Sequence, residues 1–312
     1  MHIKIGTRGS KLALWQAHYV EAQLQKGGID TEIVIIETKG DKILDRSLSK
    51  IGSKGVFTQE LEDQLKNGSI DIAVHSAKDL QSQLDEAFEI IAYTEREKAN
   101  DVLVSFDTNL SLKSGEAFVV GTSSTRRIAV LKHFYPHIRI VDMRGNLQTR
   151  MRKLHEGHCN ALILAYAGVH RMEYDDKIAE HLLLDEFTPA VGQGSVAIEC
   201  AVNLSEEKKS ILKELLNDKH TETCLRAERA FLKQLQGGCS IPVFGMATLD
   251  GEQINITGGI ISLDGQELIR KTQTGSSQFP EELGTALADE LLEAGAERIL
   301  KEIREKNGSA VI

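Results

Sequence analysis

One cysteine of this chain stands in a setting that is unusual for a packing residue. In the stretch 234–243, QLQGGCSIPV, Cys239 follows two glycines and shortly precedes a proline. A core cysteine sits in an apolar run, whereas a diglycine backbone lets a sulfur stand clear of its neighbours. A nucleophilic cysteine normally needs a histidine base or a lowered pKa, and no histidine lies within fifteen residues. A spatial partner such as His75 stays open, but the pattern favours a thiolate that carries a group covalently.

A second informative segment contains an amine and a carboxylate side by side. VHSAKDL (74–80) places His75, Lys78 and Asp79 just past an apolar strand. A strand-end aspartate beside a lysine can act as a general acid or base, or stabilise a cation. The alternative is a helix-capping aspartate next to a solvated lysine.

Arginines gather in the middle of the chain although the chain is acidic. In GTSSTRR (121–127), Ser123 and Ser124 can cap a helix whose first turn holds Arg126 and Arg127. Cations there oppose the helix dipole unless an anion sits between them, which favours ligand binding over surface decoration. Guanidinium groups match carboxylate or phosphate, so the sequence predicts a small polyanionic ligand. The gathered arginines are Arg126, Arg127, Arg144, Arg150, Arg152 and Arg171.

Composition excludes several classes of protein. The 312 residues carry 37 Lys+Arg against 46 Asp+Glu, a formal net charge of −9, which disfavours a nucleic-acid partner. No apolar run reaches the roughly 18 residues that span a bilayer, and the N-terminus lacks the features of a signal peptide, so we expect no membrane partner and a cytoplasmic location. The 4 cysteines have no metal spacing, so no metal site or disulfide framework is expected, and Cys159, Cys200 and Cys224 are interpreted as packing residues.

The elements that must position these residues alternate between strand and helix. Strand-like runs at 3–5, 31–37 and 71–76 are separated by helical patterns, and the order returns from 117 to 168. This indicates parallel βαβ units. IKIGTRGSKLALWQA also aligns with FVVGTSSTRRIAVLK, which favours one α/β half used twice over generic α/β patterning. Ligands bind at the carboxyl ends of such strands, so a cleft is expected between residues 7–10 and 122–127.

The C-terminal third differs in kind. Helical segments at 206–217 and 221–236 precede three alternating strands joined by Asp-Gly turns at 250–251 and 264–265. The tail from Pro280 to Lys306 is predicted to be one long amphipathic helix. We therefore expect a small α+β domain that carries Cys239. Earlier in the chain, the loop SKIGSKGVF holds Lys50, Lys54 and Phe57, and it is either a mobile basic flap or a plain connection.

Taken in order, these motifs resemble one enzyme family. IGTRGSKLALWQA, the KG-F loop, HSAKD, VGTSSTRR, MRGN-QTR, LAYAGVHR, PAVGQG and GGCS-P are similar to the porphobilinogen deaminases, also called hydroxymethylbilane synthases, over residues 3 to 305. The resemblance implies two periplasmic-binding-protein-like α/β domains around a cleft and a third, α+β domain with a three-stranded antiparallel sheet. The implied bounds are 1–97 with about 191–216, then 98–190, and 217–312.

The resemblance also implies the chemistry. The family joins four porphobilinogen molecules head to tail with release of ammonia, giving linear hydroxymethylbilane for tetrapyrrole and heme biosynthesis. A dipyrromethane cofactor, held through a thioether to the family cysteine, here Cys239, primes the chain and stays attached. The family is generally monomeric, so a monomer is expected.

Site residues carry over by motif. Asp79 matches the catalytic aspartate, expected as a buried carboxylate that stabilises cationic intermediates. The residues implied for the cofactor are Cys239, Lys78, Asp79, Thr122, Ser123, Ser124, Arg126, Arg127, Arg144 and Gly145. Those implied for substrate carboxylates and the loop over the cleft are Arg8, Ser10, Gln16, Lys54, Phe57, Arg144, Arg150 and Arg171. The chain departs from the family motif at Ala77 (usually Met) and Gln81 (usually Pro), which puts the rigidity of that loop in doubt.

Two rival functions remain open from the sequence. One is a non-catalytic anion-binding protein of the same two-lobed fold, and the other is a thiol-dependent transferase with a different substrate. The absence of a signal peptide and the presence of Cys239 argue against the first. A covalent pyrrolic adduct would separate the deaminase from both.

Overall fold

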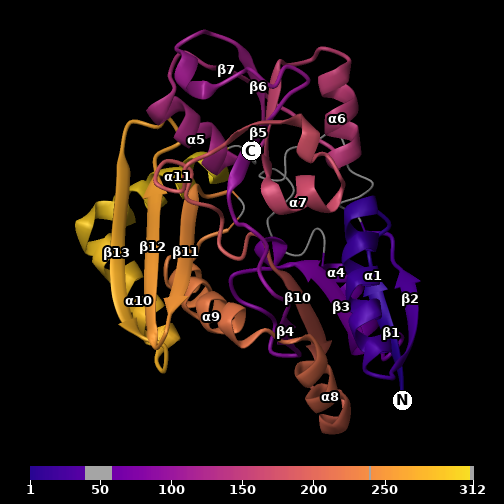
Figure 1. Ribbon diagram of the computed structural model, residues 1–312. Helices are drawn as coiled ribbons and strands as arrows, with labels where there is room; N and C mark the ends of the chain where they lie inside the picture. Colours follow the sequence, from indigo (N-terminus) through magenta and orange to yellow (C-terminus); the bar gives the residue numbers. More distant parts are fainter. Residues whose placement is uncertain (39–57, 239, 310–312) are drawn as a thin grey trace.

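The computed structural model describes residues 1–38, 58–238 and 240–309, with side chains up to residue 306. Within these ranges the chain forms three sheets with helices around them, and Figure 1 draws them as three separate regions. The predicted fold class is confirmed, namely two α/β units and a small α+β unit. No helix in the described ranges combines the length and the apolar character needed to cross a membrane.

The first sheet and its helices are called lobe 1. The sheet has the order β2-β1-β3-β10-β4. Its strands are β1 (His2–Thr7), β2 (Asp30–Ile35), β3 (Ile72–Ser76), β4 (Phe88–Tyr93) and β10 (Val196–Ala201), and its helices are α1 (Lys11–Lys26), α4 (Gln59–Lys66) and α8 (Glu206–Leu216). Helix α1 begins where the Ser10 side chain accepts from the amide of Ala13, and it buries Ala17, Val20 and Leu24 at helical spacing against the sheet.

The second sheet and its helices are called lobe 2, and they repeat the plan of lobe 1. The sheet order is β7-β6-β8-β5-β9. The strands are β5 (Asp101–Val104), β6 (Val119–Gly121), β7 (Arg139–Val141), β8 (Ala161–Ala165) and β9 (Ile178–His181), and the helices are α5 (Thr125–Phe134), α6 (Leu147–His155) and α7 (Tyr166–Arg171). Strands β6, β7 and β8 thus occupy the places of β1, β2 and β3, as the aligned segments predict.

Each five-stranded sheet contains one strand that runs against its neighbours, which the expectation of purely parallel units missed. Strand β10 is antiparallel to β3 and β4, and β5 is antiparallel to β8 and β9. Both strands follow directly after the chain has crossed from the other lobe. Such a strand enters at the carboxyl ends of the parallel strands, with Val196 opposite Ser76 and Asp101 opposite Ala165. The crossings therefore lie at the edge where α/β sheets bind ligands.

The third sheet is an antiparallel meander covered by helices (Figure 1). It comprises β11 (Val243–Asp250), β12 (Gln253–Ile261) and β13 (Leu268–Ser276), with α9 (Lys219–Gln234), α10 (Pro280–Leu291) and α11 (Glu297–Ser309). The prediction of one continuous helix from Pro280 to Lys306 is wrong. A π-helical segment, Leu292–Ala296, separates α10 from α11, and Gly295 has φ 105°, a left-handed conformation that ends regular helix and suits glycine.

A buried ion pair attaches the third unit, which comprises this sheet with α9, α10 and α11, to the lobes. Glu228 on α9 is fully buried and receives hydrogen bonds from the Arg96 guanidinium at 2.5 Å, from the amide of Gly192 at 2.8 Å and from the amide of Ala247 at 2.8 Å. Arg96 and Gly192 lie in the two connections between the lobes. The third unit is therefore fixed at those connections.

Candidate functional site

The acid and the amine of HSAKD lie on a short turn that ends strand β3. Residues Ala77–Asp79 form one turn of 3₁₀ helix. Lys78 is half-buried, and its Nζ donates to Oε1 of Gln193 at 3.4 Å. Burial lowers the pKa of Lys78 to about 8, although the neighbouring Asp79 carboxylate opposes the shift. Asp79 itself is exposed, because it stands where the chain leaves the sheet, so the expectation of a buried carboxylate is wrong for this structure.

Asp101 organises the lobe 2 side of the site. It opens strand β5, is fully buried, and accepts hydrogen bonds from Arg126 at 2.7 Å and from Arg127 at 2.6 Å, one on each carboxylate oxygen. Burial alone would raise the pKa of Asp101, but the two guanidinium groups overcome that effect and hold it far below its usual range. The carboxylate is therefore ionised at all physiological pH values.

This contact changes the interpretation of the arginine pair. We expected an anion between Arg126 and Arg127, and the structure shows that the chain itself provides one in Asp101. Arg126 also donates to the carbonyl of Thr188 and Arg127 to that of Ile163. One carboxylate still faces two guanidinium groups, so the cluster keeps a net positive charge. Nε of Arg127 is buried and has no hydrogen-bond partner among the described residues.

Gln193 joins the two sides. Its side-chain amide donates to Oδ1 of Asp101 at 2.9 Å and to the carbonyl of Ala99 at 2.6 Å, while its oxygen accepts from Lys78. The charges of Arg126 and Arg127 also act on Lys78. Lys78 of lobe 1 and the arginine pair of lobe 2 therefore belong to one electrostatic unit.

Arg150 on α6, and Arg144 in the loop that precedes α6, extend this unit. Nε of Arg150 donates to the carbonyl of Gly145 at 2.8 Å, and Arg144 pairs with Asp142 at 3.0 Å. Burial lowers the pKa of Arg150 to about 10, with a further contribution from repulsion by Arg127, whereas Asp79 opposes the shift. Arg150 is thus within electrostatic range of both Arg127 and the candidate catalytic acid Asp79.

The predicted hydroxyl and amide groups serve the local fold as well. Ser10 and Ser124 cap α1 and α5, Ser123 accepts from the amide of Met143, and Thr122 accepts from the amide of Ser124. Nε2 of Gln16 donates to Oγ of Ser76 at 2.8 Å. Ser10 lies at the start of α1, and Thr122, Ser123 and Ser124 lie at the start of α5, where helix dipoles favour anions.

The other residues that the sequence predicts for the site either lie elsewhere in the described structure or fall outside it. Arg171 donates to the carbonyl of Gly194 at 2.7 Å, and Arg8 is half-buried one residue after β1. Lys54, Phe57 and Cys239 lie outside the described residues. The three other cysteines are buried, in agreement with their interpretation as packing residues.

Sequence reasoning missed Asp101 and gave Gln193 no role. Asp101 heads the apolar run DVLV (101–104). A lone acid at the start of a buried strand needs a partner, and the arginine pair was the available one. The acid at the head of an apolar strand could therefore have identified Asp101 as the partner of the arginine pair.

The site fits a ligand with several carboxylates. Lys78, the arginine pair and Arg150 outnumber the acids Asp101 and Asp79, and the orphaned Nε of Arg127 adds a donor to a set already rich in them. Fold and site together define a two-lobed α/β protein whose cationic side chains suit a small polyanion. In the described ranges no group of three or more His, Cys, Asp and Glu residues could hold a metal ion.

Comparisons with known proteins give the family. Residues 3–209 match the family described as "Porphobilinogen deaminase, dipyromethane cofactor binding domain", and residues 222–293 match "Porphobilinogen deaminase, C-terminal domain". A porphobilinogen deaminase of Cytophaga hutchinsonii is 57% identical over 302 residues, covering 97% of each chain. One from Desulfosudis oleivorans is 50% identical over 307 residues, covering 98% of this chain and 99% of the relative.

Among solved structures, the periplasmic VFT2 domain of Bordetella pertussis BvgS is similar with a TM-score of 0.43 and 16% identity, over 73% of this chain and 92% of that chain.

The matches to the family models and to these relatives show that the chain belongs to the porphobilinogen deaminase family. It is an enzyme of tetrapyrrole biosynthesis that polymerises porphobilinogen and uses the dipyrromethane cofactor of that family.

We predict that Gly192→Ala lowers kcat about 10- to 100-fold, as small misplacements of catalytic groups do. Gly192 has φ +77°, and an added Cβ would lie 2.9 Å from the carbonyl carbon of Ala77 and 3.0 Å from the amide of Lys78. The turn that carries Asp79 would therefore have to move. Porphobilinogen consumption measures the effect.

Gly157→Ala is the matched control for this variant. Gly157 has φ +78°, so the backbone strain is the same, but nothing lies within 4 Å of an added Cβ. Its kcat should stay at the wild-type value. Equal losses in the two variants would show that strain, rather than displacement of the turn, is the cause.

Proposed function

We propose that the chain joins four porphobilinogen molecules into linear hydroxymethylbilane on a dipyrromethane held by Cys239. The observation that carries the proposal is the set of cations shared by the lobes around Asp79, since every porphobilinogen brings two carboxylates. When bound, the dipyrromethane supplies the free pyrrole carbon to which the first porphobilinogen is joined. Every other role falls to side chains of the chain itself.

The basic residues bind and orient the carboxylates. Arg126 and Arg127 present guanidinium groups that Asp101 holds in place, so their geometry is fixed before a ligand arrives. Arg150 and Arg144 extend the positive charge toward later rings. Such preorganised donors lose little orientational freedom when they bind an anion. We assign Arg8, Ser10, Gln16, Lys54, Phe57 and Arg171 to substrate binding on the family motif alone.

Asp79 is proposed as the catalytic acid–base. Loss of ammonia from porphobilinogen leaves positive charge on the pyrrole, and a carboxylate beside the ring nitrogen stabilises that charge. The same oxygen can take up the proton that each condensation releases. Exposure of Asp79 leaves its carboxylate free to face substrate.

We also propose the cellular location, the oligomeric state and the domain bounds of the chain. We infer a cytoplasmic monomer without a nucleic-acid partner, supported by the negative net charge and the family pattern. We also propose the division into residues 1–97 with 191–216, 98–190 and 217–312. It is supported by the core of lobe 1, which includes Val196, Leu212 and Leu216 beside Ile3 and Ile5. Size-exclusion chromatography with light scattering tests the monomer.

Intact-protein mass tests the function and the tether together. We predict that the purified chain carries a mass excess equal to two pyrrole units with their acid side chains, and that Cys239→Ser lacks it. Cys224→Ser, a buried cysteine of the same unit, should keep the excess. An unmodified wild-type chain that still forms hydroxymethylbilane would exclude the proposal, and modification without turnover would favour the non-catalytic rival.

We predict that Asp79→Asn lowers kcat by about 10²- to 10⁴-fold, the usual contribution of a general acid–base. The amide keeps the shape of the side chain but neither takes up a proton nor carries negative charge. Asp85→Asn, an exposed acid on the same loop, is the control and should keep full activity. Near-normal turnover of Asp79→Asn would mean that another group performs proton transfer.

The lowered pKa of Lys78 predicts a pH dependence. Below about pH 8 the ammonium is charged and attracts substrate carboxylates, and as the pH rises through about 8 it loses its proton and that attraction. We expect kcat/KM, which reports on groups of the free enzyme, to fall above pH 8. Lys78→Arg stays charged, so its profile should lose that fall, whereas Lys213→Arg on α8 should retain it. The same fall in Lys78→Arg would assign the titration to another group.

A further inference from the structure

Arg171 makes a contact that spans the two lobes. It ends helix α7 of lobe 2, and its guanidinium carbon lies 5.1 Å from the ring centroid of Trp15, on helix α1 of lobe 1. The Trp15 ring stacks in turn on Tyr19 of the same helix, with centroids 5.5 Å apart and planes 8° from parallel. A guanidinium over an indole face is a favourable cation–π arrangement, which strengthens when water is excluded.

The same guanidinium also holds the connections between the lobes. Its terminal nitrogen donates to the carbonyl of Gly194 at 2.7 Å, and that carbonyl also accepts from the amide of Glu97 at 3.2 Å. Glu97 lies in the connection from β4 to β5, and Gly194 lies in the connection from β9 to β10. A Cβ at Gly194 would come within 2.3 Å of the Glu97 carbonyl, so the connections touch there.

Arg171 is therefore bound at a point where three parts of the molecule meet, namely α1 of lobe 1, its own lobe 2, and the pair of connections. Rotation of one lobe about the connections would pull the guanidinium off the Trp15 ring or off Gly194. Burial lowers the pKa of Arg171 without making it neutral at physiological pH, so the cation stays charged.

We propose that Trp15 is a positioning residue, which holds Arg171 and thereby fixes the spacing between the lobes across the site. The proposal rests on the proposed function for its kinetic consequence only. The spacing matters because Lys78 and Asp79 belong to lobe 1, whereas Arg126, Arg127 and Arg150 belong to lobe 2. Substrate that is bound by the second set reaches Asp79 only at one separation of the lobes.

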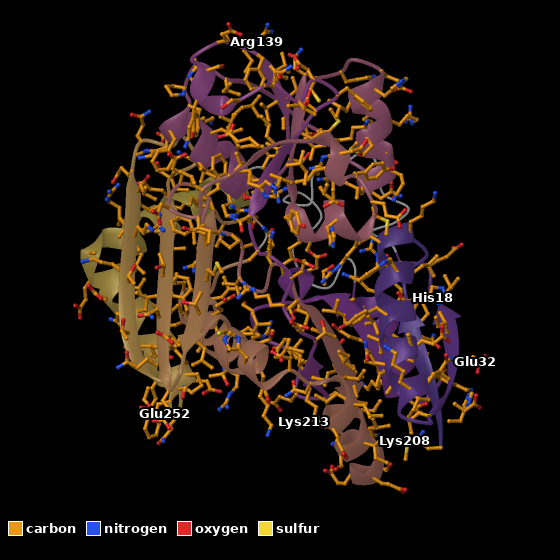
Figure 2. The ribbon with its side chains drawn as sticks, in the orientation of Figure 1. His18, Glu32, Arg139, Lys208, Lys213 and Glu252 are labelled. Atoms are coloured by element: carbon orange, nitrogen blue, oxygen red, sulfur yellow. The ribbon has the colours of Figure 1, made fainter. Side chains whose placement is uncertain are left out.

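The first test measures the spacing directly in the full-length protein. Spin labels at His18→Cys on α1 and Arg139→Cys on β7, both exposed and both labelled in Figure 2, report the distance between lobes by pulsed electron paramagnetic resonance. Trp15→Leu should broaden or shift the distance distribution, and Trp15→Phe, which keeps an aromatic face, should restore it. Arg152→Ala on α6, whose ion-pair partner Glu156 caps the end of the same helix, is the control and should leave the distance distribution unchanged.

Trp15 also reports on its own contact, since it is the one tryptophan of the chain. Arg171→Gln should make its fluorescence more easily quenched by acrylamide, because the guanidinium no longer covers the ring. Should Trp15→Leu fail to fold, Arg171→Gln measured with the same spin labels replaces it. A distance distribution that stays the same in Trp15→Leu, or in Arg171→Gln in its place, would overturn the proposal whether or not the protein makes hydroxymethylbilane.

The second test is kinetic. Trp15→Leu should lower kcat/KM about 5- to 30-fold, which corresponds to the free energy of a cation–π contact that is partly to fully shielded from water. Trp15→Phe should recover most of that loss. A changed distance distribution with unchanged kcat/KM would also overturn the proposal, because the spacing would then have no bearing on the reaction.

Discussion

The whole site depends on a single buried carboxylate. Asp101 lies between the guanidinium groups of Arg126 and Arg127 at 2.7 and 2.6 Å, with no exposure to water. Two buried cations without this partner would bear a large desolvation cost, so the carboxylate permits them to stand side by side at the start of α5. Because one negative charge faces two positive ones, the arrangement is stable without being neutral. The structural ion pair thereby also carries the positive charge that is proposed to bind anions, and Gln193 links it to Lys78 in the other lobe.

The repeated topology explains why these residues meet. Both sheets place their ligand-binding edge toward the connections, and in both the strand that arrives from the other lobe, β5 or β10, runs against its neighbours. Asp101 opens one of these strands, and Gln193 lies in the connection shortly before the other, which begins at Val196. Groups that hold the site together are therefore on the connections, while most of the groups proposed to contact substrate are on the loops and helices after the parallel strands. Glu228 anchors the third unit at the same crossing.

Much of this could be predicted from the sequence, and the misses have physical causes. Strand and helix alternation, the repeated half and the Asp-Gly hairpins are local patterns, so they were predicted correctly. The antiparallel strands were missed because direction in a sheet depends on where the chain comes from, not on the strand's own residues. Asp101 was missed because its partners lie 25 and 26 residues away, and the break at Gly295 because amphipathic spacing continues across it. The catalytic and binding roles of the site residues remain predictions, and Lys54, Phe57 and Cys239 lie outside the described residues.

The two crossings of the chain have a consequence for synthesis on the ribosome. Strand β10 lies between β3 and β4, so these two earlier strands have no contact with each other until residues 196–201 have emerged. The sheet of lobe 2 is built from a continuous stretch, residues 101–181, and can be completed first. A nascent lobe 1 thus waits with two unpaired strand edges, which are sites for mispairing and aggregation. Translation speed between β4 and β10, and chaperone capture of that intermediate, should therefore govern the yield of folded enzyme.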